Sequence, residues 1–268
     1  MSVTAAPSRI HRFEAIENVR DYGDYATAAG RRLASGRLLR SGHHARATDA
    51  DLQRLIDMGT AVIVDLRHPM ERSYQPSRRA PDWKGLVIES DIDNDEAGEP
   101  PHVTFLKSGD LSAEAVGRYM TDAYQRIPFE ARHLDLFSRY FDALAETDGA
   151  VLIHCAAGKD RTGLLAALTH RITGVSEDDL LEDYLLTNTA VDLGGRAADI
   201  ARSLEVNYGK KASPEAVQAF MGVREEFLAT SFKVIDERFG SLDRYLAEAC
   251  GVSPEKRDRI AARLCGED

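Results

Sequence analysis

The chain has 268 residues, of which 43% are hydrophobic and 29% charged, and its formal net charge is -10. These values are typical of a soluble globular protein with a sizeable core, and the acidic balance argues against nucleic-acid binding. No run of residues approaches the ~18 apolar residues of a membrane-spanning helix, so no stable membrane insertion is expected. Because the N-terminus lacks an apolar signal segment, we expect a cytoplasmic location; secretion by a route that leaves no N-terminal mark stays open.

The first half of the chain predicts short strands around one helix. Residues 36–41 and 86–88 are typical of short strands, and the β-branched run over 61–67 indicates a buried parallel strand. Thr48 can cap a helix that runs to Met58. Residues 91–112 are polar and rich in acids and proline, and they are predicted as a long loop.

The second half is predicted to be mostly helical, with one further strand over 150–154. The helices are expected over 113–126, 129–146, 161–172, 177–187, 195–206, 214–229, 231–238, 242–249 and 254–264. This order predicts an α/β fold with a mostly parallel central sheet flanked by helices, and with extra C-terminal helices. We expect a single domain over 1–268, with a catalytic core over about 13–190 and a helical C-terminal part over about 191–268. Residues 91–125 and 189–222 are candidate covers over the site.

The stretch 154–163, which reads HCAAGKDRTG, lies between the strand over 150–154 and the helix over 161–172. A tight loop in this context places the thiol of Cys155 in a ring of backbone N–H groups at a helix N-terminus, where anions bind. Only a thiolate attacks, and the helix dipole, the N–H groups and the charge of Arg161 all favour the ionised form. Cys155 is therefore predicted to be a nucleophile that receives a phosphoryl group.

The other residues of the loop suit the same chemistry. Arg161 offers a planar fork that holds two phosphate oxygens at once, and Thr162 can hydrogen-bond the thiolate. Gly158 permits a positive φ at the turn, and Lys159 adds charge for a multiply anionic substrate. The residues expected to contact substrate are Ala156, Ala157, Gly158, Lys159, Thr162 and Arg67.

Asp160 is the candidate general acid, because its carboxyl group lies within the loop and within reach of a leaving oxygen. A structural ion pair with a nearby arginine is the alternative interpretation. Asp91, Asp93 and Asp95 on the polar stretch compete for the same role, although a solvated acidic loop explains them more simply.

Asp65 and Arg67 end the strand over 61–67, and ligands of parallel sheets bind at such strand ends. Arg67 could recruit phosphate or fasten a loop, and an ion pair with Asp65 accounts for both residues equally well. His154 is expected to hold the backbone of Cys155; an ordinary buried histidine is the alternative. The three cysteines, Cys155, Cys250 and Cys265, show no paired spacing, which suits a reducing compartment. No second cysteine or histidine lies at metal-ligand spacing in the loop, so neither a metal nor a cofactor is expected.

The stretch 154–163 resembles the HCxxGxxR[ST] motif of the cysteine-dependent protein tyrosine phosphatase superfamily. It is closer still to the loop HCxAGKDRTG of an atypical bacterial branch of tyrosine/lipid phosphatases. Residues 18–23, 39–41, 64–67 and 183–188 resemble further segments of that branch, so the likeness runs from about 13 to 190. Two positions depart from the pattern, Val19 where Phe is usual and Asp24 where a second glycine is usual.

The resemblance implies a tyrosine phosphatase fold and hydrolysis of phosphotyrosine, often with phosphoserine, phosphothreonine or phosphoinositides as further substrates, and no metal. It also implies that Asp160 is the acid, since no WPD-type loop is found. The partner would be a phosphorylated protein or a phosphoinositide, and the sequence does not separate a protein phosphatase from a phosphoinositide phosphatase. Further alternatives are a rhodanese-like sulfurtransferase, an arsenate reductase and a non-catalytic phosphate-binding module.

Overall fold

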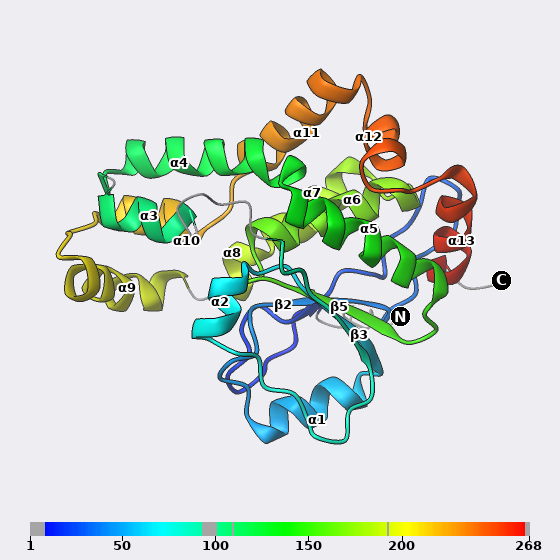
Figure 1. Ribbon diagram of the computed structural model, residues 1–268, viewed down its shortest axis with the longest axis horizontal. Coiled ribbons are helices and arrows are strands. Elements are labelled where there is room, and N and C mark those ends of the chain that lie inside the picture. The colour runs from blue at the N-terminus through cyan, green and yellow to red at the C-terminus, as the bar shows by residue number, and fades with distance from the viewer. Residues whose placement is uncertain (1–8, 93–100, 109, 192, 266–268) are drawn as a thin grey trace, which may run out of the picture.

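The computed structural model describes residues 9–92, 101–108, 110–191 and 193–265. Within them, a five-stranded sheet has the strand order β1-β2-β5-β3-β4 (Figure 1). β1 runs antiparallel to β2, and all other neighbouring strands are parallel. The predicted mostly parallel α/β sheet is therefore confirmed. The strands are β1 (Arg20–Asp21), β2 (Leu38–Ser41), β3 (Thr60–Asp65), β4 (Leu86–Ile88) and β5 (Ala150–His154).

Helices cover both faces of the sheet and extend beyond it on one side (Figure 1). In chain order they are α1 (Asp49–Asp57), α2 (Pro69–Tyr74), α3 (Pro101–Ser108), α4 (Ala113–Arg126), the 3-10 helix η1 (Ile127–Phe129), α5 (Ala131–Glu146), α6 (Asp160–Thr173), α7 (Glu177–Leu185), α8 (Thr187–Ala190), α9 (Leu193–Tyr208), α10 (Pro214–Met221), α11 (Glu225–Phe239), α12 (Leu242–Glu248) and α13 (Pro254–Cys265).

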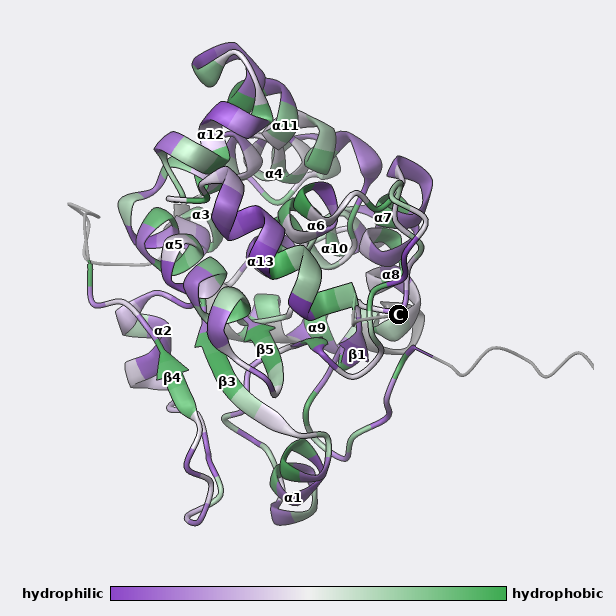
Figure 2. Ribbon diagram, turned by 90° about the vertical axis from the view of Figure 1, so that its right-hand side faces the viewer, coloured by the Kyte–Doolittle hydropathy of each residue, from purple (hydrophilic) through white to green (hydrophobic). Residues whose placement is uncertain are grey.

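Side chains of the central strands alternate between two cores, as the period of two along a strand requires. Ile63 and Leu152 pack with Leu55 of α1 on one face. Val64 and Ile153 point to the other face and belong to the larger core, to which α5, α6 and α13 contribute. Figure 2 shows these apolar strands between α1 and the layer of helices on the opposite side. Burying each such aliphatic side chain stabilises the fold by roughly 1.5–3 kcal/mol.

The loop predicted over 91–112 contains a helix, α3, so that prediction is wrong for 101–108. The ring of Phe105 stacks on that of Tyr119 in α4, with centroids 4.2 Å apart. Leu106 packs with Leu204 of α9 in a small satellite core. A short helix gains most of its stability from such tertiary packing, which a local pattern does not reveal.

The helices predicted over 214–229 and 231–238 are divided differently in the structure. α10 ends at Met221, and α11 runs without interruption from Glu225 to Phe239. The side chain of Asn188 accepts a hydrogen bond from the Val223 N–H at 2.8 Å and donates one to the Val223 carbonyl at 3.0 Å. Both backbone groups of the break are thus satisfied by a side chain 35 residues away, so the chain turns there instead of continuing as a helix.

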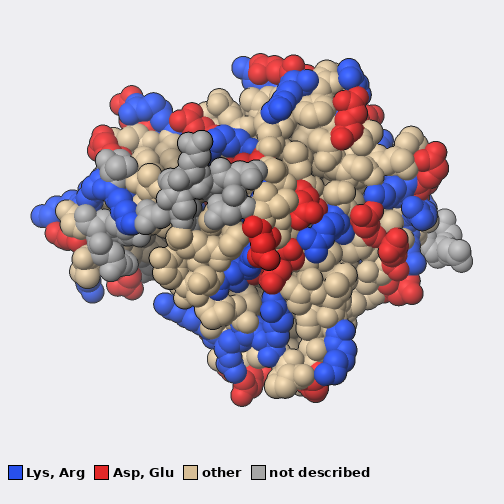
Figure 3. Space-filling view, viewed as in Figure 1, with Lys and Arg blue, Asp and Glu red and all other residues tan. Residues whose placement is uncertain are grey.

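The C-terminal helices share the main core with the sheet, since Leu228 of α11, Tyr245 of α12 and Leu264 of α13 belong to the same cluster of buried residues. α3, α4, α9 and α10 form a lobe beside this body (Figure 1). No described helix is long and apolar enough to span a membrane. Basic and acidic side chains are interspersed over the face seen in Figure 3. Arg72 pairs with Asp91, and Arg78 pairs with Asp49.

Candidate active site

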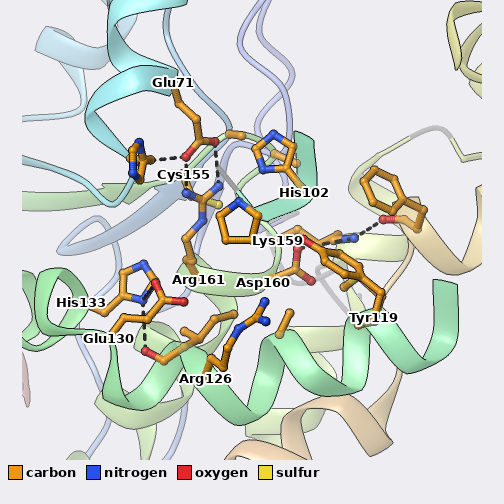
Figure 4. Close-up of a pocket in the computed structure, with 18 of the residues that line it drawn as sticks. Glu71, His102, Tyr119, Arg126, Glu130, His133, Cys155, Lys159, Asp160 and Arg161 are labelled. Carbon is orange, nitrogen blue, oxygen red and sulfur yellow. Dashed lines mark hydrogen bonds and ion pairs between the residues drawn. The ribbon is translucent and has the colours of Figure 1, made fainter. Parts of the chain in front are cut away.

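β5 leads directly into the loop over 155–159, and α6 begins at Asp160, so the predicted order of strand, loop and helix is confirmed. Cys155 is 2% exposed and lines a cavity of about 190 Å³. Figure 4 shows this cavity with Cys155, Lys159, Asp160 and Arg161 on the loop side and side chains of α2, α3 and α4 around them. α10 completes the lining through Phe220 and Met221.

The carbonyl groups of the loop face outward, away from the cavity. The Ala156 carbonyl accepts a hydrogen bond from the His43 N–H at 3.0 Å. The side-chain amide of Asn18 donates to the carbonyls of Ala157 at 3.0 Å and Gly158 at 2.8 Å. Among the described residues, the N–H groups of 156–161 make no hydrogen bond. They are therefore left for an anion, which is the arrangement predicted for substrate binding.

Gly158 has a φ of 66°, the left-handed conformation predicted for this turn. A Cβ atom at this position would lie 2.2 Å from the carbonyl oxygen of Ser41 at the end of β2. Both the backbone conformation and this close approach to β2 therefore require glycine.

A buried ionic layer supports the loop from behind. Arg20 and Arg40 both bind Asp183, at 3.1 and 2.6 Å. Arg40 also donates to the Gly158 carbonyl at 3.1 Å, and Arg20 donates to the side-chain oxygen of Asn18. Burial would raise the pKa of Asp183, but the two arginines outweigh it and lower the pKa to about 2. The sequence prediction missed this layer, although its members lie in the segments 18–23, 39–41 and 183–188 that carried the resemblance.

Glu71 of α2 holds the guanidinium of Arg161. The Nη1 and Nη2 atoms of Arg161 lie 2.6 and 3.0 Å from the two carboxylate oxygens, and Nη1 also lies 3.4 Å from the Leu66 carbonyl. A guanidinium has five N–H donors, so about two stay free for a substrate oxygen. Burial would raise the pKa of Glu71, but Arg161 outweighs it and lowers the pKa to about 2.

Sequence reasoning missed Glu71. The signal that it left is a capping box, because Glu71 also accepts a hydrogen bond from the N–H of His68, the N-cap of α2, at 2.8 Å. That pattern marks the start of a helix and does not reveal a partner for Arg161.

Asp160, the candidate general acid, stands at the first turn of α6 and lines the cavity. Its Oδ1 atom accepts a hydrogen bond from the hydroxyl of Tyr124 at 2.8 Å. Its Oδ2 atom lies 3.5 Å from Nζ of Lys159, which in turn donates to the Phe220 carbonyl of α10. The ion pair observed for Asp160 is thus with a lysine and not with the arginine considered from the sequence.

Of the three competing acids, the structure describes Asp91. Asp91 pairs with Arg72 at 2.5 Å, and its side chain is 93% exposed. Asp93 and Asp95 fall outside the described residues. Of the candidate acids that the structure describes, Asp160 is the one that lines the cavity together with Cys155.

Arg67 and Asp65 form a buried pair, with the Nη2 atom of Arg67 2.7 Å from Oδ2 of Asp65. Arg67 also donates to the Gln75 carbonyl at 2.7 Å and to the Ser77 hydroxyl at 2.8 Å. It is not among the residues that line the cavity. Of the two interpretations of Arg67, the geometry favours fastening the segment after α2, and it does not favour the predicted contact with substrate.

His154 is completely buried and stacks on His44, with ring centroids 4.5 Å apart. Its Nδ1 atom lies 3.3 Å from the Cys155 carbonyl, and its Nε2 atom lies 3.6 Å from Asp65. Burial lowers the pKa of His154 despite the neighbouring carboxylate, so the ring is neutral at pH 7. The contact of its ring with the Cys155 carbonyl places His154 behind the backbone of Cys155, as expected for a supporting residue.

Thr162 is buried, and its hydroxyl has no hydrogen-bond partner among the described residues, which leaves it available to the thiolate. Burial raises the pKa of Cys250 to about 12, so this thiol is unsuited to attack. Within the described ranges no group of three or more His, Cys, Asp and Glu side chains is placed to hold a metal ion.

Comparison with known proteins identifies the family of the chain. Residues 11–266 match the model of a family described as the tyrosine phosphatase family. The chain is 34% identical over 274 residues to the triple specificity protein phosphatase PtpB of Mycobacterium tuberculosis, covering 93% of this chain and 96% of that protein. It is 33% identical over 243 residues to a predicted tyrosine-protein phosphatase of Cupriavidus necator, covering 90% of this chain and 84% of that protein.

Among solved structures, that of TpbA from P. aeruginosa covers 81% of this chain and 99% of its own, with a TM-score of 0.35 and 18% identity. The family match extends over nearly the whole chain, and it includes the loop of Cys155 and the residues that support it. The chain therefore belongs to the tyrosine phosphatase family and is a protein-tyrosine phosphatase.

Proposed function

We propose that this enzyme hydrolyses phosphotyrosine through a cysteinyl-phosphate intermediate. The thiolate of Cys155 attacks phosphorus, while Arg161 and the inward N–H groups of the loop hold the phosphoryl oxygens. Asp160 protonates the leaving phenolate, and a water molecule then hydrolyses the cysteinyl-phosphate as a carboxylate accepts its proton. Covalent catalysis replaces one difficult displacement by two easier ones.

The observation that carries this proposal is that nucleophile, anion-binding fork and acid all line one cavity. Two of them are held by a partner, since Glu71 holds Arg161 and Tyr124 holds Asp160. Preorganised donors of this kind stabilise developing charge without reorganising during the reaction. A rhodanese-like sulfurtransferase would not require Asp160 as an acid. A thiosulfate:cyanide assay would detect sulfurtransferase activity.

The walls of the cavity favour an aromatic phosphate ester. Tyr119, Met120 and Ile127 line it next to the loop, together with Phe220 and Met221 of α10. Apolar walls with a few convergent polar groups are typical of sites that enclose a ring. Phosphotyrosine is therefore the substrate that we propose first.

A second candidate substrate is a phosphoinositide or another polyanionic ester, and phosphoserine or phosphothreonine proteins are also candidates. In Figure 4 the side chain of Arg126 rises from α4 toward the cavity, and Arg132 and Lys159 line it as well. Three cations beyond Arg161 suit a substrate with more than one negative group. The M. tuberculosis relative is named a triple specificity phosphatase, which supports testing all of these substrates.

The decisive variant for the mechanism is Cys155→Ser. We expect turnover of an aryl phosphate to fall by at least about 1,000-fold, as on loss of a catalytic nucleophile, while vanadate binding measured by calorimetry persists. Retained turnover would contradict the cysteinyl-phosphate mechanism. On the wild-type enzyme, kcat/KM compared over phosphotyrosine, phosphoserine and phosphothreonine peptides and phosphoinositide vesicles then ranks the proposed substrates.

A further inference from the structure

Two buried phenols form a hydrogen-bonded chain that ends on Asp160. The hydroxyl of Tyr184 in α7 lies 2.7 Å from that of Tyr124 in α4, and Tyr124 donates to Oδ1 of Asp160 at 2.8 Å. Tyr124 is 0% and Tyr184 1% exposed. The hydrogen-bonded chain thus connects two helices, α4 and α7, to the candidate acid at the start of α6 through buried hydroxyl groups.

The direction in which these hydrogen bonds are donated follows from Asp160, the acceptor at the end of the series. Burial, and then the Asp160 carboxylate, raise the pKa of Tyr124 well above its ordinary value, so its hydroxyl keeps its proton. Since Tyr124 uses that proton for Asp160, its oxygen accepts the hydrogen bond from Tyr184. Hydrogen bonds in series polarise one another toward the charged end, so Tyr184 strengthens the donor that Tyr124 presents to Asp160.

The two oxygens of Asp160 therefore have different surroundings. Oδ1 is taken by Tyr124, and Oδ2 has only the ammonium of Lys159, at 3.5 Å. A proton carried on Oδ2 could reach a leaving oxygen in the cavity, whereas one on Oδ1 would displace the hydrogen bond from Tyr124. The other ionisable groups whose charge interacts with that of Asp160 are Arg161, Tyr119 and His102.

We propose that Tyr124, supported by Tyr184, is a positioning residue that stabilises the Asp160 carboxylate as it forms in the first chemical step. The proposal rests on the proposed role of Asp160 as the acid. In that step the bond from Sγ of Cys155 to phosphorus forms, the bond from phosphorus to the leaving oxygen breaks, and the proton on Oδ2 moves to that oxygen.

Asp160 becomes negatively charged as its proton leaves, while Tyr124 donates to it throughout the step. A hydrogen bond to a carboxylate is about twice as strong as one to a neutral acid. Compared with the enzyme form in which Asp160 carries this proton, the bond from Tyr124 is therefore stronger in the transition state, and only such interactions accelerate the chemistry.

The test is Tyr124→Phe, which removes one hydroxyl and keeps the ring that stacks on Phe227. kcat/KM, which reports the first step, is measured for p-nitrophenyl phosphate, whose leaving group needs no proton, and for phenyl phosphate, whose leaving group does. We expect a loss of about tenfold for phenyl phosphate and of less than about twofold for p-nitrophenyl phosphate. Tyr184→Phe should give a smaller loss, of about threefold, confined to the same substrate.

A matched control exists in the same fold. Tyr22 and Tyr140 form another buried pair of hydroxyls, 2.7 Å apart, and Tyr140 bonds onward to Thr169, not to Asp160. Tyr140→Phe therefore costs a comparable buried hydrogen bond, and its effect on the two substrates should be equal. Inhibition by vanadate, measured for every variant, should be unchanged if the loop keeps its shape.

Asp160→Asn is measured first and should itself lose activity selectively on phenyl phosphate. If it does, equal losses on both substrates for Tyr124→Phe, or no loss on either, would overturn the proposal. If Asp160→Asn shows no such selectivity, the acid role of Asp160 fails together with the proposal, and this result is distinct from the first. Should Tyr124→Phe fail to fold, Tyr184→Phe decides in the same way, because it leaves the contact between Tyr124 and Asp160 in place.

Discussion

Three charged side chains in the cavity are held by groups from other parts of the chain. Glu71 holds Arg161, the Phe220 carbonyl holds Lys159, and Tyr124 holds Asp160. The side chains that face a substrate phosphate thus have few conformations left to lose when it binds, which is the advantage of a supported site. The same reasoning applies to the backbone of the loop, whose orientation depends on Asn18.

Asn18→Asp replaces the two-donor amide of Asn18 by a carboxylate of the same shape, at a position whose φ of 56° Asp also tolerates. The hydrogen bond accepted from Arg20 can persist, but the carbonyls of Ala157 and Gly158 would then face a negative oxygen. We expect kcat/KM for an aryl phosphate to fall by about 100-fold, since two donors to the loop are lost. Affinity for vanadate should fall in parallel. Unchanged vanadate affinity with reduced activity would show that Asn18 does not orient the N–H ring.

Among the elements of the fold, three helices of the lobe beside the sheet, α3, α4 and α10, contribute side chains to the cavity. Phe220 and Met221 end α10 at the cavity, and the break that follows is held by Asn188. The position of these two side chains therefore depends on where the helix stops. Residues 189–222, expected from the sequence as a candidate cover, include this helix, and their role as a lid stays a prediction.

Asn188→Ala removes both hydrogen bonds to Val223 and leaves a part-buried N–H and carbonyl without partners. We expect the free energy of unfolding, measured by urea denaturation, to fall by about 2 kcal/mol, with faster proteolytic cutting near 222–224. Gln53→Ala is the control, because that exposed amide makes a single side-chain bond to Asp57 on α1 and should change stability by less than about 0.5 kcal/mol. Equal effects of the two substitutions would show that Asn188 does not hold the break.

At the scale of the whole molecule, ionisable groups are built into the interior as well as into the surface. Arg20, Arg40 and Asp183 are buried together behind the loop, and Glu71 and Arg161 are paired at the cavity. Removing one member of such a set leaves an unpaired buried charge, which is far more costly than losing an exposed pair. Stability should therefore depend on pH through these groups.

Two sets of buried side chains, carboxylates paired with arginine and neutral histidines, should make the protein less stable as the pH falls. The pKa of Glu71 and that of Asp183 are lowered to about 2 by their arginine partners, in spite of burial. These carboxylates take up protons more readily in the unfolded chain, so their contribution is present above their ordinary pKa and is lost as the pH falls toward about 2. Burial also lowers the pKa of His44 and that of His133, so the unfolded chain gains protons there first, below about pH 6.5.

The free energy of unfolding should thus decline from about pH 6.5 downward, as measured by urea denaturation at several pH values. Glu114→Gln, in an exposed i,i+4 pair with Arg118, is the control and should leave the curve unchanged. A flat curve between about pH 6.5 and 3 would contradict the prediction.

The features of the fold and of the site that depend on neighbouring residues could be predicted from the sequence. The apolar run before Cys155, the glycine at 158 and the helix-forming run after Arg161 specify a strand, a loop and a helix locally. That local order places the thiol at a helix N-terminus, and the spacing of Cys155 and Arg161 identified the chemistry. The parallel sheet followed from the alternation of strands and helices.

The partners that hold these groups could not be predicted from the sequence, because they come from distant parts of the chain. Arg161 and Glu71 are 90 residues apart, Asp160 and Tyr124 are 36 apart, and Ala157 and Asn18 are 139 apart. The helix α3, which lies in a stretch predicted as a loop, packs on a second helix, α4, through the stacking of Phe105 on Tyr119. A local sequence pattern predicts the conformation of the backbone. Which distant residues become partners depends on which helices and strands lie side by side. That arrangement is established when their apolar faces pack into a common core.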